Sequence, residues 1–194
     1  EGTIYGASQV DGLKLASGVG TGKGLSFDGV DDYVRVLNTP IFNRSNGQEI
    51  TVAVWINPSR LSGQYQDIVC NRSASLHNWI LYQHANDGAV SFHGVAQNKS
   101  SYIPTLNQWT HIAATVNSSG LLNLYANGVL VYTLSGYQYQ SSAPNELSIG
   151  NFGSAEYYKG LIDDVRIYSA ALSQAQIQQY YANGLRTHQP LAQQ

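Results

Sequence analysis

Short apolar stretches recur along most of this chain, and turn-forming residues separate them. Between residue 23 and about residue 168 they follow one another every eight to twelve residues or so, each bounded by Gly, Asn, Asp or Ser. In the stretch from Glu49 to Ile56, aliphatic residues alternate with Thr51, Ala53 and Trp55. Both faces of this strand are apolar, so we expect it to lie inside a sheet. The pattern predicts an all-β fold of two packed antiparallel sheets.

Local signals predict two hairpins and one helix. Asn127-Gly128 between two apolar runs is typical of a type I′ turn, and Asn86 to Gly88 marks a second hairpin. Ser173 and Gln176 form a capping box, and Gly184 has the position of a C′ residue, so we expect a short C-terminal helix over about 174–182. One domain spans 1–194 in this interpretation, with its core at about 20–183 and a loose tail at 186–194.

Composition and charge exclude several classes of function. The 194 residues are 43% apolar and only 11% charged, with a formal net charge of -2 and no basic run. Nucleic-acid binding is therefore not expected, because it needs clustered cations. No apolar stretch is long enough for insertion into a membrane. The chain starts at Glu1 and contains no methionine, so we expect a mature or excised segment. The lone cysteine, Cys70, is expected to be a buried apolar residue.

Three segments, in their order and spacing, resemble the laminin-G-like family of the concanavalin A-like lectin and glucanase superfamily. They are Gly24 to Val34, Trp109 to Val129, and Leu147 to Ser173. The resemblance covers roughly residues 20–183. It implies a two-sheet antiparallel β-sandwich of the jelly-roll type, with a concave face that binds or cleaves glycans, in an extracellular or cell-surface protein.

The acidic residues do not form the pair that a glycosidase of this fold requires. Such enzymes carry two carboxyl groups close together, commonly on alternate positions of one strand. The four glutamates, Glu1, Glu49, Glu146 and Glu156, are far apart, and none has an aspartate two residues on. Catalysis would need two acids from distant strands to converge in a cleft. We therefore expect no catalytic residues.

The expected role is a non-catalytic carbohydrate-binding module within a larger multidomain protein, with a glycan or polysaccharide as its partner. The alternative is a protein-interaction or adhesion domain of the laminin-G type. An exposed apolar patch would favour that alternative, whereas a groove lined by Tyr, Asn and Gln would favour sugar.

Five of the twelve acidic residues fall in two short segments: Asp28, Asp31 and Asp32, and then Asp163 and Asp164. Clustered carboxylates with carbonyls from a glycine-containing turn suit calcium. Superfamily members often carry a calcium, and the resemblance implies a structural ion here. Its expected ligands are Asp163, Asp28 and the Gly29 carbonyl, with Asp31 and Asp164 as further candidates. Alternatively, Asp163 bonds the 28–29 turn or pairs with Arg35 or Arg166.

Tyrosines dominate the expected ligand-binding surface. Tyr65, Tyr137, Tyr139, Tyr157 and Tyr158 lie in loop-like sequence rich in Gly, Ser and Gln, where burial is not expected. Such rings can stack on sugars while amides and charged groups bond the hydroxyls. Further candidates on the concave sheet are Arg72, His77, Trp79, Tyr82, His93 and Gln97. The histidine spacings match no zinc motif, so we expect each histidine to have its own hydrogen-bond partners and not to share a metal ion.

Overall fold

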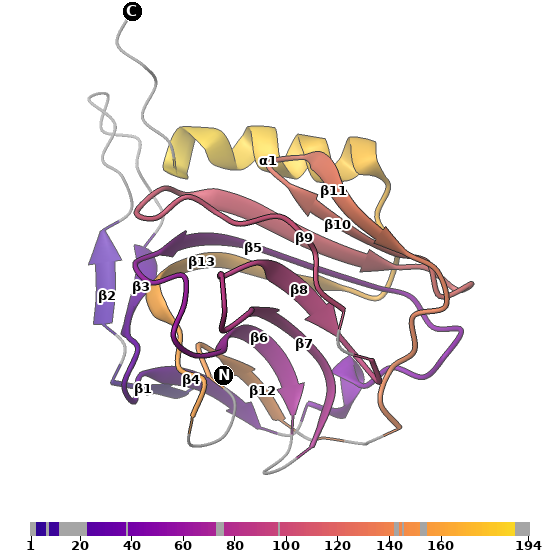
Figure 1. Cartoon of the computed structure of the whole chain (residues 1–194), viewed down its shortest axis with the longest axis horizontal. Coiled ribbons are helices and arrows are strands. Elements are labelled where there is room, and N and C mark those ends of the chain that lie inside the picture. The colour runs from indigo at the N-terminus through magenta and orange to yellow at the C-terminus, as the bar shows by residue number, and fades with distance from the viewer. Residues whose placement is uncertain are drawn as a thin grey trace, which may run out of the picture.

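Two antiparallel sheets pack face to face in the computed structural model, which describes residues 3–6, 8–11, 23–37, 39–72, 76–96, 98–141, 144, 146–151 and 155–188 (Figure 1). Within these residues one sheet has six strands, in the order β1 (Thr3–Tyr5), β4 (Tyr33–Leu37), β12 (Glu146–Ile149), β6 (Gln66–Arg72), β7 (His77–Gln83) and β8 (Val90–His93). The other has seven, in the order β11 (Val129–Leu134), β10 (Leu122–Ala126), β9 (Thr110–Val116), β5 (Ile50–Pro58), β13 (Lys159–Tyr168), β3 (Lys23–Asp28) and β2 (Ser8–Asp11). The expected two-sheet sandwich is confirmed. A short 3₁₀ turn, η1 (Pro40–Phe42), and one helix, α1 (Gln174–His188), complete the described elements.

The core lies between the sheets, and β5 contributes one complete apolar face to it. Its four inward side chains are fully buried: Ile50, Val52, Val54 and Ile56. Burial of each such side chain contributes roughly 1.5–3 kcal/mol relative to exposure. The other face of β5 carries Ala53 and Trp55, as the alternation predicts. The hairpin between β10 and β11 also forms as expected, with Asn127 and Gly128 at φ 50 and 77.

Four residues expected to contact ligand are instead part of the core. Tyr137 and Tyr139 are each 4% exposed, while Tyr158 and Trp79 are fully buried. Two of their polar atoms are paired: the Tyr139 hydroxyl donates to the Gln48 carbonyl at 3.0 Å, and Trp79 Nε1 donates to the Phe42 carbonyl at 3.0 Å. The hydroxyls of Tyr137 and Tyr158 are buried without a hydrogen-bond partner among the described residues. The prediction of exposure was wrong because these segments fold inward over the sandwich.

Helix α1 lies on the outer face of the seven-stranded sheet (Figure 1). Ile177 packs there with Ala53, Ala113 and Tyr125. The capping box is present, since Ser173 N donates to Gln176 Oε1 at 2.9 Å. No helix in the described part of the chain is long and apolar enough to cross a membrane.

The helix is longer than predicted and continues to His188. Gly184 does not end it. A Cβ at this position would lie 2.4 Å from Nε1 of Trp55, so the glycine allows the helix to approach that indole ring. Residues 186–188, predicted to be a loose tail, are therefore helical, while 189–194 lie outside the described residues.

His188 anchors the end of α1 to the sheet beneath it. Its buried ring stacks on Trp55, with centroids 4.4 Å apart and planes at 6°. Nε2 lies 3.0 Å from Oδ2 of Asp163 on β13. Burial alone would raise the pKa of Asp163, but hydrogen bonds from His188 and the Asp164 backbone outweigh it and hold that pKa below its ordinary value.

Replacing Asp163 with Asn is expected to destabilise the protein by roughly 1–3 kcal/mol at pH 7, because His188 loses its charged partner. A depressed carboxyl pKa adds stability above the unfolded pKa of about 4, and this contribution disappears as the pH falls through the folded pKa. The difference between wild type and variant should therefore shrink at pH 3. Urea denaturation at both pH values measures it.

The matched control is Asp164→Asn. Asp164 is partly exposed and pairs at 3.5 Å with the equally exposed Arg166. Such surface pairs contribute about 0–1 kcal/mol. An equal loss of stability in both variants, or an Asp163→Asn effect that does not change between pH 7 and pH 3, would contradict the stabilising contact between Asp163 and His188.

Candidate functional site

A cavity of about 170 Å³ opens on the outer face of the six-stranded sheet. It is lined by residues from β6, β7 and β8, from the loop before β6, and from the segment before β13. The lining residues are Tyr65, Asp67, His77, Ile80, Tyr82, His93 and Glu156. This is the face of the sandwich opposite to α1.

Strand alternation explains why Ile80 and Tyr82 point outward. On β7, Trp79 and Leu81 belong to the core between the sheets, so Ile80 and Tyr82 lie on the other face. The register then sets Ile80 beside His93 of β8, and Tyr82 beside Asp67 of β6.

Four rings form the aromatic part of the cavity wall. The centroids of Tyr65 and Tyr82 are 5.8 Å apart, and those of Tyr82 and His93 are 6.1 Å apart. His77 and His93 are closer, at 4.8 Å. Ile80 extends this apolar surface beside Tyr82. The wall therefore offers several ring faces to a bound molecule.

The two histidines interact with each other, which the sequence-based expectation of isolated histidines missed. Burial, with His77 as a further cause, lowers the pKa of His93 to about 4. Burial also lowers the pKa of His77, against a backbone hydrogen bond with Gly94. Both rings are therefore neutral at pH 7, and a neutral imidazole has one donor and one acceptor nitrogen.

Asp67 and Glu156 bring two carboxyl groups to the same cavity. Asp67 is 2% exposed, and its Oδ2 is buried without a hydrogen-bond partner among the described residues. Its backbone N–H donates to the Glu156 carbonyl at 2.9 Å, which holds the two segments together. Glu156 is half-buried at φ 62, a conformation that costs a side-chain-bearing residue on the order of 1 kcal/mol or more.

Burial governs the protonation of both acids. It raises the pKa of Asp67 well above its ordinary value, and Glu156 raises it further while Arg72 opposes the shift. Burial also raises the pKa of Glu156. The cavity therefore disfavours an additional negative charge.

Arg72 lies beside the cavity but does not line it. Its Nε is 3.0 Å from Glu146 Oε1, and the other carboxylate oxygen of Glu146 is 2.6 Å from Arg35. This charged row crosses three neighbouring strands of the same outer face: β4, β12 and β6. Arg72 therefore belongs to an ion-pair network next to the cavity.

The remaining predicted ligand contacts fall into two groups. Tyr65 and His77 line the cavity, together with Tyr82 and His93. Tyr157 is half-buried and does not line it, and its carbonyl accepts hydrogen bonds from Arg60 at 2.6 Å and Gln64 at 3.2 Å. Gln97 lies outside the described residues.

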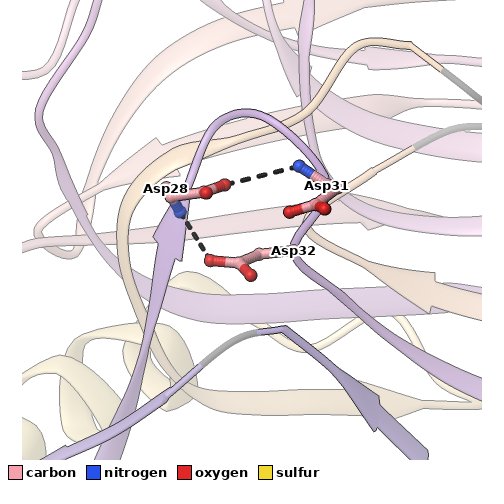
Figure 2. A group of neighbouring side chains, drawn as sticks. All are labelled: Asp28, Asp31 and Asp32. Atoms are coloured by element: carbon pink, nitrogen blue, oxygen red, sulfur yellow. Dashed lines mark hydrogen bonds between the residues drawn. The ribbon is translucent and has the colours of Figure 1, made fainter.

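Three aspartates gather at the turn between β3 and β4 (Figure 2). Carboxylate oxygens of Asp28, Asp31 and Asp32 lie within 4.8 Å of one another. Asp28 Oδ1 accepts the Val30 N–H at 2.7 Å, and Asp32 Oδ2 accepts the Asp28 N–H at 2.7 Å. Asp32 was part of the acidic segment but was not among the expected ligands.

Two of the other expected calcium ligands, Asp163 and Asp164, lie elsewhere. Asp163 pairs with His188. The residue of β13 that lies opposite Asp28 is Lys159, and Asp163 is four residues further along the strand. Asp164 pairs with Arg166 rather than with the turn. Gly29 remains in the turn at φ 80. The structure therefore brings Asp28 and Asp31 together with Asp32, and separates them from both acids of β13.

The chemistry of the three-aspartate cluster fits a hard cation. Burial raises the pKa of Asp32, and the like charges of Asp28 and Asp31 add to the shift. A bound cation would relieve this repulsion. Calcium prefers six to eight oxygen ligands, so carbonyls and water would have to complete the three carboxylates.

Solved structures with the same fold include binding domains of larger proteins. One is domain 4 of AbnA, a GH43 extracellular arabinanase from Geobacillus stearothermophilus, which was solved in complex with arabinotriose. Its sequence is 21% identical to this chain and its TM-score is 0.70, and the match covers 92% of this chain and 86% of that one. The binding domain of Paraclostridial Mosquitocidal Protein 1 is 18% identical with a TM-score of 0.73, over 94% of this chain and 47% of that one.

The receptor-binding domain of botulinum neurotoxin D is also 18% identical, with a TM-score of 0.70, over 95% of this chain and 48% of that one. The chain thus spans about half the length of the toxin domains it matches. At these identities the likeness establishes the fold alone. No curated protein sequence matches the chain.

The sequence itself matches the Laminin_G_3 family over residues 27–178, which include every strand from β4 to β13. This match agrees with the two-sheet sandwich and its C-terminal helix. The chain therefore belongs to the Laminin_G_3 family of the concanavalin A-like lectin/glucanases superfamily.

Proposed function

We propose that this chain is a non-catalytic carbohydrate-binding module that holds one sugar unit of an oligosaccharide in the cavity on the outer face of the six-stranded sheet. One observation carries the proposal: Asp67, a buried acid whose Oδ2 has no hydrogen-bond partner among the described residues, lines a cavity whose wall is made largely of aromatic rings. Ligand sites of small molecules combine apolar walls with a few convergent polar groups in this way.

Sugar chemistry matches this arrangement. The apolar C–H faces of a sugar can pack on Tyr65 and Tyr82, while its hydroxyl groups donate to Asp67 and bond the neutral histidines. The cavity volume of about 170 Å³ is below the range of roughly 300–1,000 Å³ for drug-sized ligands, which suits a single ring. The arabinotriose complex of the AbnA domain supports the same class of ligand.

We further infer that the module works within a larger extracellular protein, as the AbnA domain does in its arabinanase. A protein-interaction or adhesion role would instead require a partner surface such as an exposed apolar patch.

Truncation of the aromatic wall is expected to weaken sugar binding. Tyr65→Ala and His93→Ala should each lower the affinity for a bound oligosaccharide by about three- to tenfold, because each removes a ring that contacts the ligand. Isothermal titration with neutral di- and trisaccharides, arabinotriose among them, measures the change. Tyr157→Ala is the matched control, since Tyr157 is half-buried and outside the cavity. Loss of binding in the control alone would contradict the assigned site.

Although two acids share the cavity, we expect no glycoside hydrolysis. A glycosidase needs one carboxyl group ionised and the other protonated, so its environment must separate the two pKa values. Here burial raises the pKa of both Asp67 and Glu156, and the two acids come from separate segments and not from alternate positions of one strand. Incubation of the protein with each oligosaccharide that it binds should release no new reducing ends. Release that is lost in Glu156→Gln would contradict the binding-only role.

We also propose that Asp28, Asp31 and Asp32 hold a structural calcium ion. A cation that binds only the folded state, at a free concentration of about one hundred times its Kd, raises the free energy of unfolding by about 2.7 kcal/mol. For a chain of this size, this corresponds to a rise in Tm of roughly 5–10 °C. Thermal melts in calcium and in chelator should differ by this amount. Asp31→Asn should reduce the difference, whereas Asp164→Asn should preserve it. A calcium effect that only Asp164→Asn removes would contradict the three-aspartate site.

A further inference from the structure

We propose that the cavity discriminates by charge: it accepts uncharged sugar units and rejects sugars that carry a carboxylate, sulfate or phosphate. This inference rests on the proposed function and adds the class of sugar that the same site takes.

The lining of the cavity has acidic groups and lacks a cation. Among its described lining residues, Asp67 and Glu156 carry carboxyl groups, and none is Lys or Arg. His77 and His93 add no positive charge at pH 7, because their pKa values are lowered by burial. An anionic ligand would therefore either face a carboxylate or force Asp67 and Glu156 to bind protons.

The arginines nearest to the cavity are already engaged. Arg72 and Arg35 both bond Glu146, and the side chain of Arg72 is only 11% exposed. Arg60 donates to Gln66 Oε1 at 3.2 Å and to the Tyr157 carbonyl at 2.6 Å. Moving one of these cations to a ligand would break an ion pair or a hydrogen bond that it makes within the protein, which is costly.

An uncharged sugar meets none of these obstacles. Its hydroxyl groups are donors, and the cavity lining offers them the carboxyl groups of Asp67 and Glu156. A hydrogen bond to Oδ2 of Asp67 would give a partner to a buried polar atom that has none among the described residues. The lining thus offers hydrogen-bonding groups to a neutral polyol and no cation to an anion, and such a difference between related ligands is what specificity requires.

Matched pairs of neutral and acidic sugars test the proposal. Titrations at pH 7 would compare galactotriose with trigalacturonate, glucose oligomers with glucuronate-bearing ones, and lactose with sialyllactose. In every pair that binds, the neutral member should bind at least about tenfold more tightly. An acidic member that binds as tightly as its partner would overturn the inference. Absence of binding by all of these sugars would overturn the proposed function itself.

Charge-removing variants assign the discrimination to the two acids. Asp67→Asn and Glu156→Gln should each reduce the ratio of neutral-sugar to acidic-sugar affinity at least threefold. Glu156 is half-buried whereas Asp67 is buried, so Glu156→Gln disturbs the fold less than Asp67→Asn. Arg35→Gln, a control outside the cavity, should leave the ratio unchanged. An unchanged ratio in both acid variants, or acidic-sugar binding that requires Arg35, would show that the cavity does not discriminate by charge.

Discussion

Apolar packing between the two sheets determines which side chains of β7 face outward. The inward faces of β5 and β7, with Val52 and Val54 on one side and Trp79 and Leu81 on the other, belong to one continuous core. Since strand side chains alternate, burying Trp79 and Leu81 forces Ile80 and Tyr82 onto the opposite face. The outer cavity is therefore a direct consequence of the inner core, and a one-residue slip of β7 would abolish both.

The cavity also depends on residues that contribute nothing to ligand contact. Tyr158 is buried edge-on against Phe27, with ring centroids 6.3 Å apart, and its backbone N–H donates to the Gly150 carbonyl at 2.8 Å. This tyrosine fixes the segment that presents Glu156. The Phe27 ring also fills the space beside Gly150, where a Cβ would lie 2.4 Å from it. Phe27 precedes the three-aspartate turn, so the turn and the cavity share one packed support.

Periodicity and turn chemistry were sufficient to predict the architecture. The alternation in β5, the Asn127-Gly128 turn and the capping box at Ser173 are local signals, and each corresponds to local geometry in the structure. The prediction that Gly184 ends the helix was wrong. A single sequence does not distinguish a glycine that ends a helix from one that allows the helix to pack closely on its neighbour. The structure separates them through the nearby Trp55 ring.

The candidate site was only partly predictable, because it depends on which distant strands become neighbours. Tyr65, His77, Tyr82 and His93 could be proposed from aromatic character and strand position. Asp67 and Glu156 could not, since nothing local indicates that β6 and the segment before β13 meet. The polar sequence around Tyr137 and Tyr139 also led to the wrong prediction that these side chains are exposed, whereas their rings are part of the core.

The position of α1 has a practical consequence for handling the protein on a solid support. The helix covers the outer face of the seven-stranded sheet (Figure 1). The cavity opens on the outer face of the six-stranded sheet. A cysteine placed at exposed Ala182 would provide a single coupling point, because the native Cys70 is fully buried and burial raises the pKa of its thiol. Molecules coupled there would all face the solution with their cavities outward, which gives a uniform array for affinity capture.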